Sequence, residues 1–381
     1  MKRKVPWIPL AIAVIASLFW IAIGSTVVAK AKTYDFLSAY TAGMLARQGN
    51  FARLYDADLQ YRVQKQAASD APIRIFVIRP PIFALMTAPF ALLPFIPSFW
   101  LWIGSQIAAL LAFWVWAARR FGSDALVYCA FFLPAAAGLM NGQDNVWMMA
   151  VVSLAYLLRE RGRPIAAGAV LAIGLVKFHL LLLFPLAMAV SGEWRMLAGF
   201  SIAGAGEAIL SLALVGWSGL QQYWALLHRP GQDVIAPVPS IMIDVQALPL
   251  NFGIDAGWVG LLLAMAVIPV LAIAVRGAPL WRWFSAAAVA SLLVSPHVYK
   301  YDATLLLLPI LLAIFTSHSK FTRIAAATAV IPIPYLFSFA GPPYGVVPPL
   351  TLLTFLVALA CESYRERHAV QPTEQQIAVT A

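Results

Sequence analysis

Residues 6–29 read PWIPLAIAVIASLFWIAIGSTVVA and contain no charged side chain. A transmembrane helix needs about 20 consecutive, predominantly apolar residues, so this run is long enough to cross a bilayer. Lys2, Arg3 and Lys4 precede the run, as basic residues precede the apolar part of a signal peptide. The run is longer than that part usually is, and it lacks a clear cleavage site of small residues. We therefore expect a retained first helix over residues 7–29.

The apolar character extends along the whole chain. Of the 381 residues, 62% are hydrophobic and 11% are charged, and the mean hydropathy is +0.82. A soluble domain carries roughly 25% charged residues, so this chain cannot cover a water-facing surface of that size. The composition therefore predicts an all-α polytopic membrane protein.

The formal net charge of +10 does not indicate a nucleic-acid partner. Most Lys and Arg residues lie between apolar runs, where they set the orientation of a membrane protein. Cys129 and Cys361 both lie within apolar stretches, so neither suggests a disulfide framework or a metal site.

Basic residues also guide the topology, because they are enriched in cytoplasmic loops. The basic residues that we place inside are Lys2 to Lys4, Arg119 and Arg120, Arg159 to Arg163, Arg195, Arg276 and Arg282, Lys320 and Arg323, and Arg365 and Arg367. This placement predicts about 12 transmembrane helices with both chain ends in the cytoplasm. The expected crossings are residues 7–29, 98–118, 123–139, 143–158, 164–177, 178–192, 196–216, 257–275, 281–295, 301–316, 321–338 and 346–361.

Two segments require specific assignments. Residues 80–97 contain five prolines, which interrupt helices, so we expect an interfacial or re-entrant segment there. Residues 164–192 must cross twice, as two short helices that turn near Lys177. The chain then forms a single membrane domain over 1–381, without an internal repeat. Its extracytoplasmic loops are 31–79, with amphipathic helices, and 217–256, and residues 363–381 form a cytoplasmic tail.

This orientation places most of the remaining ionisable side chains on the extracytoplasmic side. They are Asp35, Arg79, the segment 141–145, Lys177, His179 and the segment 295–302. Placing a charged group at membrane depth costs free energy, so such groups usually belong to a functional site. Their convergence therefore favours a functional site over coincidence.

Structural roles for these residues remain open. Asp35 and Asp302 are also suited to cap the helices that follow them. Gln143 and Asn145 are suited to satisfy backbone groups at helix ends, and Lys177 to snorkel toward the interface. Asp56 and Asp58 resemble a metal pair, but a cap for the helix expected over 59–68 is the better interpretation.

Several short motifs occur in order along the chain. They are Tyr34-Asp35-Phe36, Leu54-Tyr55-Asp56, Pro80-Pro81, Gly142-Gln143-x-Asn145, a helix over 168–177 ending in lysine, Ser295-Pro296-His297, and Tyr301-Asp302. In this order and spacing, from Asp35 to about Leu311, the chain resembles the polyprenol-phosphate-mannose-dependent mannosyltransferases of glycosyltransferase family 87 (the DUF2029 group).

The resemblance implies a GT-C-type helix bundle and a catalytic aspartate at the start of the first extracytoplasmic loop, here Asp35. It also implies a donor sugar that is linked through phosphate to a membrane polyprenol. One position departs from the family, which often has an aromatic residue before the proline pair, where this chain has Arg79. This departure points to a shifted donor or acceptor preference.

The chemistry of the residues suggests roles in such a transfer. Asp35 would be the general base of an inverting, single-displacement reaction. Cationic or hydrogen-bonding groups would stabilise the leaving phosphate; the candidates are Arg79, Lys177, His297 and Lys300. Gln143, Asn145 and Asp302 would orient sugar hydroxyls or the basic residues. Because cations can balance the phosphate, we expect neither a metal nor another cofactor.

We therefore expect a glycosyltransferase of the bacterial inner (plasma) membrane with an extracytoplasmic active site. Its partners would be a polyprenyl-phosphate-linked sugar, most simply mannose, a glycolipid or glycan acceptor, and membrane lipid. Three alternatives remain: a transporter or flippase for a lipid-linked sugar, an O-antigen-ligase-like glycan transferase, and a structural membrane subunit.

Overall fold

The computed structural model describes residues 7–9, 11–12, 14–15, 22, 35–69, 75–228, 238–255 and 257–369. Most of the first expected crossing (7–29), parts of both expected extracytoplasmic loops and the end of the expected tail lie outside these residues. The described residues form α-helices and 3-10 helices (η), and their one isolated β-bridge joins Met242 to Tyr299. The all-α class expected from the sequence agrees with this architecture.

The helices follow one another with these bounds: α2 (Phe36–Arg47), η1 (Phe51–Arg53), α3 (Ala57–Ala67), α4 (Pro81–Thr87), η2 (Phe90–Leu92), α5 (Phe95–Phe121), α6 (Asp124–Phe131), α7 (Leu133–Met140), α8 (Asn145–Glu160), α9 (Pro164–Ala172), η3 (Ile173–Leu181), α10 (Phe184–Val190), α11 (Trp194–Leu227), η4 (Pro239–Ile241), α12 (Ala247–Leu250), α13 (Gly257–Val275), α14 (Leu280–Val294), η5 (Lys300–Leu306), α15 (Leu307–Thr316), α16 (Lys320–Val330), α17 (Ile333–Leu336), η6 (Phe337–Phe339), η7 (Tyr344–Val346) and α18 (Val347–Ala369).

Five helical segments in the described part of the chain are long and apolar enough to cross a membrane: Phe95–Phe121, Pro164–Leu181, Trp194–Leu227, Gly257–Val275 and Tyr344–Ala369. A sixth arises if α16 and the helix after its 43° bend count as one span. Other expected crossings are short helices, such as α6 with 8 residues and α15 with 10. The figure of about 12 crossings therefore stays a prediction.

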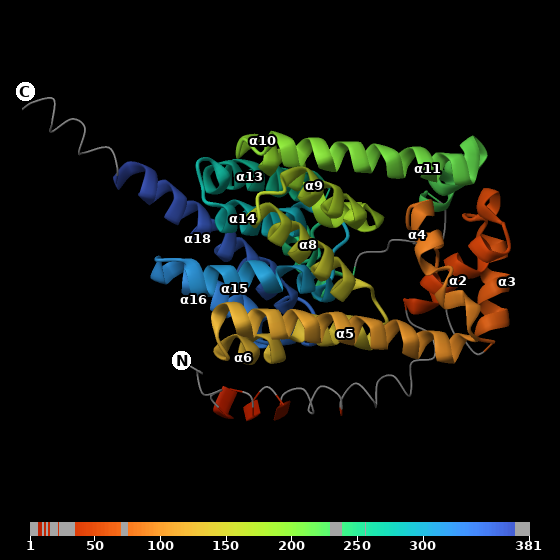
Figure 1. Cartoon of the computed structure of the whole chain (residues 1–381), viewed down its shortest axis with the longest axis horizontal. Helices are drawn as coiled ribbons and strands as arrows, with labels where there is room; N and C mark the ends of the chain where they lie inside the picture. The colour runs from red at the N-terminus through yellow and green to blue at the C-terminus, as the bar shows by residue number, and fades with distance from the viewer. Residues whose placement is uncertain are drawn as a thin grey trace, which may run out of the picture.

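The two longest helices, α5 and α11, lie on opposite flanks of the bundle (Figure 1). They contain 27 and 34 residues, which correspond to about 40 and 50 Å. Both extend past the ends of shorter helices such as α8, which has 16 residues. Helices α2, α3 and α4 gather at this projecting end, where α4 contacts both α2 and α11. Side chains from α2, α4, α5 and α11 line one hollow at this end of the bundle, which we call the recess.

The segment from α9 to α10 enters and leaves the bundle at the same end. Arg159 at the end of α8 forms two hydrogen bonds, of 2.6 and 2.7 Å, with Glu193 just before α11. Both α9 and α10 also contact α11. Between them the helical backbone is broken at Lys177 (φ −124°, ψ 54°). Lys177 thus lies at the inner tip of this segment, facing the recess.

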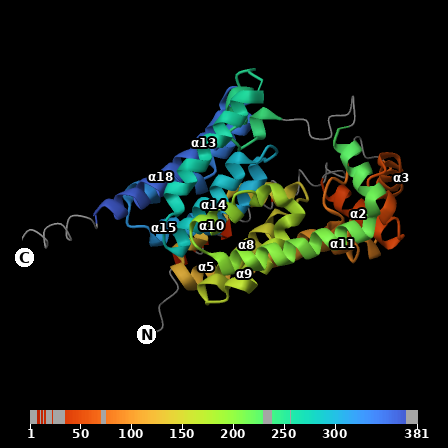
Figure 2. The ribbon, with the colours of Figure 1, turned by 90° about the horizontal axis from the view of Figure 1, so that it is seen from above.

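Residues 80–97, expected to be interfacial or re-entrant, form α4, η2 and the start of α5. The boundary expected at residue 217 coincides with a kink in α11 at Gly216, whose φ of 67° suits glycine. After the kink, α11 bends toward α2 and α3, and α13 and α18 diverge from it on the other side (Figure 2). The recess is therefore bordered by elements from distant parts of the chain.

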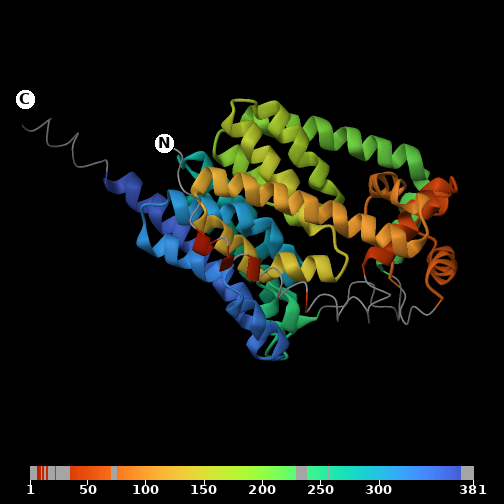
Figure 3. The ribbon, with the colours of Figure 1, turned by 60° about the horizontal axis from the view of Figure 1, so that its bottom comes forward.

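Helices α14, α15, α16 and α18 pack side by side (Figure 3). A buried ion-pair cluster joins α14 to α18. Arg282 of α14 lies 3.2 Å from Glu362 and 2.6 Å from Glu366 of α18. Glu362 also accepts a hydrogen bond of 2.7 Å from Ser317, which follows α15. Arg282 and Glu362 are both buried.

We expect Arg282→Met to lower the free energy of unfolding by about 3–5 kcal/mol, because it leaves the buried Glu362 carboxylate uncompensated. Equilibrium unfolding in detergent would measure this loss. Arg120→Met is the matched control, since Arg120 pairs with Glu160 at an exposed site and such pairs contribute about 0–1 kcal/mol. Equal losses in the two variants would contradict a stabilising role for the buried cluster.

Candidate functional site

A cavity of about 940 Å³ occupies the recess. Its polar lining includes Asp35, Ser38, Arg79, Gln143, Asp144, Lys177, His179, Tyr223, His297, Tyr299, Tyr301 and Asp302. These residues come from the start of α2, the segment before α4, the loop before α8, the tip at Lys177, the bent part of α11 and the segment before α15. The cavity is thus built where these elements converge.

Asp35 is the first described residue of the first loop, and its side chain is not used as a cap. It occupies the N-cap position of α2 but makes no side-chain capping hydrogen bond. Asp35 Oδ2 instead accepts a hydrogen bond from Nε2 of Gln143. The capping role that the sequence left open for Asp35 is therefore wrong.

An aromatic cluster holds the start of α2 in place. The ring of Phe36 lies 5.6 Å from those of Phe95 and Phe99, and 5.5 Å from that of Trp102. Trp102 Nε1 donates a 3.0 Å hydrogen bond to the carbonyl oxygen of Gly142. Large aromatic side chains bury a large apolar area and have few rotatable bonds. This packing fixes Asp35 beside the loop that carries Gln143.

Gly142 allows this close approach. Its φ is 68°, and a Cβ atom there would lie 2.9 Å from Cβ of Phe36. A residue with a side chain would be strained in this backbone conformation and would also push α2 away. Gly142 therefore turns the chain so that Gln143 reaches Asp35.

Arg79 is positioned by an extended segment that pairs with side chains of α3. The Val77 N–H donates a 2.9 Å hydrogen bond to Gln60 Oε1, and the carbonyl oxygen of Ile75 accepts one of 2.5 Å from Gln64 Nε2. The Tyr55 hydroxyl donates to the carbonyl oxygen of Arg79, at 2.7 Å. Two buried glutamines thus form the hydrogen bonds that this backbone segment does not form with a strand. They thereby hold Arg79 at the cavity wall.

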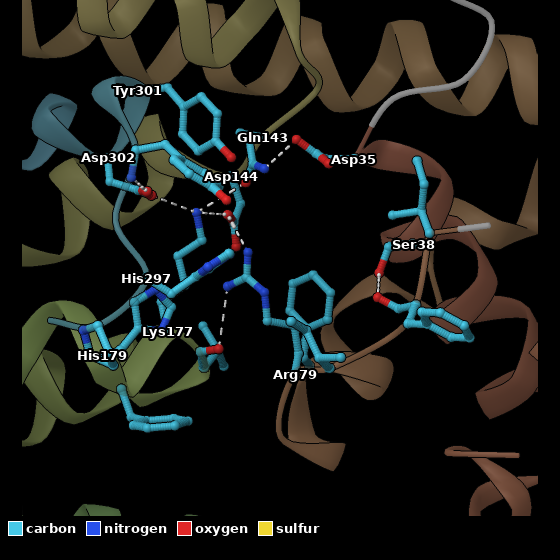
Figure 4. A pocket seen from close by; sticks show the side chains of 18 of the residues that line it. Asp35, Ser38, Arg79, Gln143, Asp144, Lys177, His179, His297, Tyr301 and Asp302 are labelled. Atoms are coloured by element: carbon cyan, nitrogen blue, oxygen red, sulfur yellow. Dashed lines mark hydrogen bonds and ion pairs between the residues drawn. The ribbon is translucent and has the colours of Figure 1, made fainter. Parts of the chain in front are cut away.

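The guanidinium group of Arg79 lies over the ring of Phe83, 5.3 Å from its centroid. Nη1 donates to the carbonyl oxygen of Val176 at 3.3 Å, and Nη2 lies 3.2 Å from Asp144 Oδ1. The side chain is 18% exposed. Asp35 and Arg79 border the same open space (Figure 4).

Lys177 lies at the centre of a buried polar network (Figure 4). Its Nζ atom is 2.8 Å from Asp144 Oδ1 and 3.3 Å from Asp302 Oδ1. It donates hydrogen bonds to Oε1 of Gln143, at 3.1 Å, and to Oδ1 of Asn145. Lys177 is 2% exposed, so it does not snorkel toward the interface. Gln143 and Asn145 likewise use their side chains within the network.

Asp302 both caps a helix and contributes to the network. Its Oδ2 atom accepts a 2.9 Å hydrogen bond from the N–H of Tyr299, the N-cap of η5, whereas Oδ1 faces Lys177. The segment before η5 is held by backbone bonds, since Ile243 N–H donates to the Val298 carbonyl oxygen at 3.1 Å. His297 lines the cavity and packs against Tyr299, with 4.8 Å between ring centroids.

The electrostatic setting differs between Asp35 and His297. Burial raises the pKa of Asp35, although the Gln143 hydrogen bond and the charges of Lys177 and Arg79 partly oppose the rise. Burial also lowers the pKa of His297, and the two cations reinforce this against the opposing charge of Asp302. Asp35 is therefore more basic than an exposed aspartate, and His297 tends to be neutral.

The structure brings together most of the residues that the sequence selected. Lys300 is the exception: it is buried away from the cavity, with Nζ 3.3 Å from the centroid of the Phe339 ring. Asp144 bridges Arg79 and Lys177; its segment, 141–145, was expected at the site, but no role was assigned to Asp144 itself. The signal for Asp144 in the sequence was its position in that segment, between Gln143 and Asn145.

Asp56 acts as the N-cap of α3, with its side chain accepting hydrogen bonds from the N–H groups of Asp58 and Leu59. This confirms the capping interpretation of the Asp56-x-Asp58 motif. Among the residues that the structure describes, no group of three or more His, Cys, Asp or Glu side chains is arranged to hold a metal ion.

The sequence model of glycosyltransferase family 87 matches residues 78–296, more than half of the chain. Arg79, Asp144 and Lys177 fall within the match, whereas Asp35 precedes it and Asp302 follows it. Comparisons with curated proteins and with solved structures found no match. The family expected from the sequence is confirmed: the chain belongs to glycosyltransferase family 87 and is a membrane glycosyltransferase.

Proposed function

We propose that this protein transfers a sugar, most simply mannose, from a polyprenyl-phosphate donor to a glycolipid or glycan acceptor. The reaction takes place on the extracytoplasmic face of a bacterial inner membrane and inverts the anomeric configuration. The observation that carries this proposal is the pairing, across one cavity, of a half-buried carboxylate (Asp35) with a cationic wall that includes Arg79.

Asp35 is suited to be the base. Its Oδ2 atom is held by Gln143, which leaves Oδ1 to accept the proton of an attacking hydroxyl group. A general base works best when its pKa approaches the working pH, and burial raises the pKa of Asp35 in that direction. With Asp35 as the base, the acceptor hydroxyl would attack the anomeric carbon of the donor in a single displacement. This reaction would convert a β-linked donor into an α-linked product.

Arg79 is suited to bind the leaving phosphate. A guanidinium group has five N–H donors, and the contacts with Val176 and Asp144 use two of them. Arg79 lines the cavity and its side chain is 18% exposed, so the remaining donors are available to phosphate oxygens, whose geometry a guanidinium group matches. His297, in its neutral form, would donate one further hydrogen bond.

An apolar stripe supports a lipid-linked donor. Phe178, Leu182, Leu186 and Val190 follow one another at intervals of four residues, and all are exposed, by 36% to 47%. Phe178 and Leu182 line the cavity, and α10, which carries the last two, contacts both α11 and α13. Exposed apolar side chains therefore continue from the cavity onto α10, beside α11 and α13, where we place the isoprenoid chain of the donor.

The test is transfer by purified protein in detergent, with synthetic polyprenyl-phosphate-mannose as donor and a lipid extract as acceptor pool. We expect a mannosylated product whose linkage is inverted relative to the donor. Transfer from a different polyprenyl-phosphate sugar would keep the reaction class and change the sugar. Tight binding of the donor without any transfer would instead favour a lipid-linked sugar transporter.

We expect Leu186→Trp to block the proposed path of the lipid without altering the polar site, because Leu186 lies beyond the residues that line the cavity. The KM for a long-chain donor should rise by about tenfold, the effect of losing roughly two buried CH₂ groups. The KM for a donor with a single isoprene unit should not change. Leu154→Trp, an exposed site on α8, is the matched control. An equal effect on both donors would place the lipid elsewhere.

A further inference from the structure

The ammonium group of Lys177 is fully engaged. Its Nζ atom lies 2.8 Å from Asp144 Oδ1, 3.1 Å from Gln143 Oε1 and 3.3 Å from Asp302 Oδ1, and it also donates to Asn145 Oδ1. An ammonium group has three N–H donors, so these four acceptors already exceed its capacity. Its side chain is 3% exposed. A phosphate group would have to displace one of these oxygens to reach it.

Gln143 lies between the ammonium group of Lys177 and the carboxylate of Asp35. Lys177 can only donate, so it faces the amide oxygen Oε1 of Gln143. The other end of the same amide, Nε2, donates to Asp35 Oδ2. Because the oxygen and nitrogen of an amide have nearly the same shape, the hydrogen-bond partners decide which way it points. Lys177 thus sets the direction in which Gln143 presents its N–H group to Asp35.

We propose that Lys177 is a positioning residue, whose ammonium group fixes the amide of Gln143 and thereby orients the Asp35 carboxylate and keeps it ionised. This assignment rests on the proposed function, in which Asp35 is the base. It differs from the role that the sequence suggested for Lys177, which was direct binding of the donor phosphate.

The consequence for Asp35 follows from hydrogen-bond chemistry. Without Lys177, the Gln143 amide is free to turn its oxygen toward Asp35. An acceptor facing a carboxyl group favours its protonated form, whereas an N–H donor favours the carboxylate. Burial already raises the pKa of Asp35, and the Gln143 hydrogen bond and the Lys177 charge are the next two influences, both lowering it. Removal of Lys177 would weaken both of these influences, so the pKa of Asp35 should rise.

The experiment is a titration of Asp35 by the infrared absorption of its protonated carboxyl group, with the spectrum of Asp35→Asn subtracted. The proteins are wild type, Lys177→Met, Gln143→Met and the double variant, all in detergent. We expect each single substitution to raise the titration midpoint by about one pH unit or more. The double variant should shift it by less than the sum, because part of the effect of Lys177 acts through the hydrogen bond that Gln143 donates.

Lys320→Met is the matched control, since Lys320 is exposed at the start of α16 and does not line the cavity. It should leave the midpoint unchanged. If Lys177→Met does not fold, Lys177→Met combined with Asp302→Asn removes one charge of each sign and takes its place. An unchanged Asp35 midpoint, or fully additive shifts, would overturn the assignment.

Kinetics provide a second readout. A positioning role predicts that Lys177→Met lowers kcat at saturating donor and moves the acid limb of the pH profile upward, with little change in donor KM. A rise in donor KM alone, with kcat and the Asp35 titration unchanged, would show a phosphate ligand instead. Wild type that transfers no sugar would refute the proposed function, while the infrared titration would still decide whether Lys177 controls Asp35.

Discussion

Asp35→Asn should reduce kcat by about 10²–10⁴-fold while donor binding is retained, because the substitution keeps the shape of the side chain and removes the base. Asparagine still accepts the hydrogen bond that Gln143 donates to Oδ2 of the aspartate, so the cavity wall should hold its geometry. The measurement is transfer from polyprenyl-phosphate-mannose under single-turnover conditions, together with donor affinity. Turnover that survives in Asp35→Asn would move the base elsewhere.

The matched control is Asp58→Asn, an exposed aspartate in the first turn of α3 within the same loop. It should transfer sugar like the wild type. If the two variants lose equal activity, the loss reflects the loop rather than the chemistry of Asp35.

The pH profile provides an independent check on Asp35. The base must be deprotonated to act, so kcat/KM of the wild type should fall as the pH decreases through the pKa of Asp35. Burial raises this pKa above the ordinary value of 3.8, so the fall should begin at a higher pH than an exposed aspartate would give. The residual activity of Asp35→Asn should lack this acid limb.

The distribution of Lys and Arg along the chain predicted which polar residues come together in the candidate site. Lys and Arg residues between apolar runs set the orientation, and the polar residues left over fell on one side. The structure joins Asp35, Gln143, Asn145, Lys177 and Asp302, from distant parts of the chain, through direct hydrogen bonds and ion pairs. Their convergence was thus predictable, whereas their individual roles were not, because hydropathy and spacing do not reveal which oxygen faces which donor.

The direction of side chains in short irregular segments could not be predicted from the sequence. Nothing in the pattern around Asp144 indicates that the turn at Gly142 aims three consecutive side chains into the network. In the same way, the first residues of η5 point Asp302 toward Lys177 and Lys300 toward Phe339. Both outcomes depend on local φ and ψ angles and on tertiary packing, which spacing does not determine.

The lengths of the helices could not be predicted from the sequence for a related reason. The apolar run over 123–139 reads as one crossing, but the chain ends α6 at Phe131 and begins α7 at Leu133, beside Pro134. Proline is favoured in the first turn of a helix and disfavoured in its interior, so it divides the run. Hydropathy detects apolar runs and does not detect such breaks.

Arg79→Met should lower kcat/KM for the donor by about 10²–10³-fold, because it removes the cation that borders the open space opposite Asp35. Lys177 remains 2.8 Å from Asp144, so that carboxylate keeps a partner and the fold should persist. Arg79→Lys should recover only part of the activity, because an ammonium group cannot bind Val176, Asp144 and two phosphate oxygens at once. Arg53→Met, which removes an exposed ion pair with Asp56 in the same loop, is the matched control. A donor kcat/KM that is unchanged in Arg79→Met would exclude Arg79 from the phosphate site. A loss that Arg79→Lys fully restores would show that the positive charge alone matters, and that the two-pronged geometry of the guanidinium group does not.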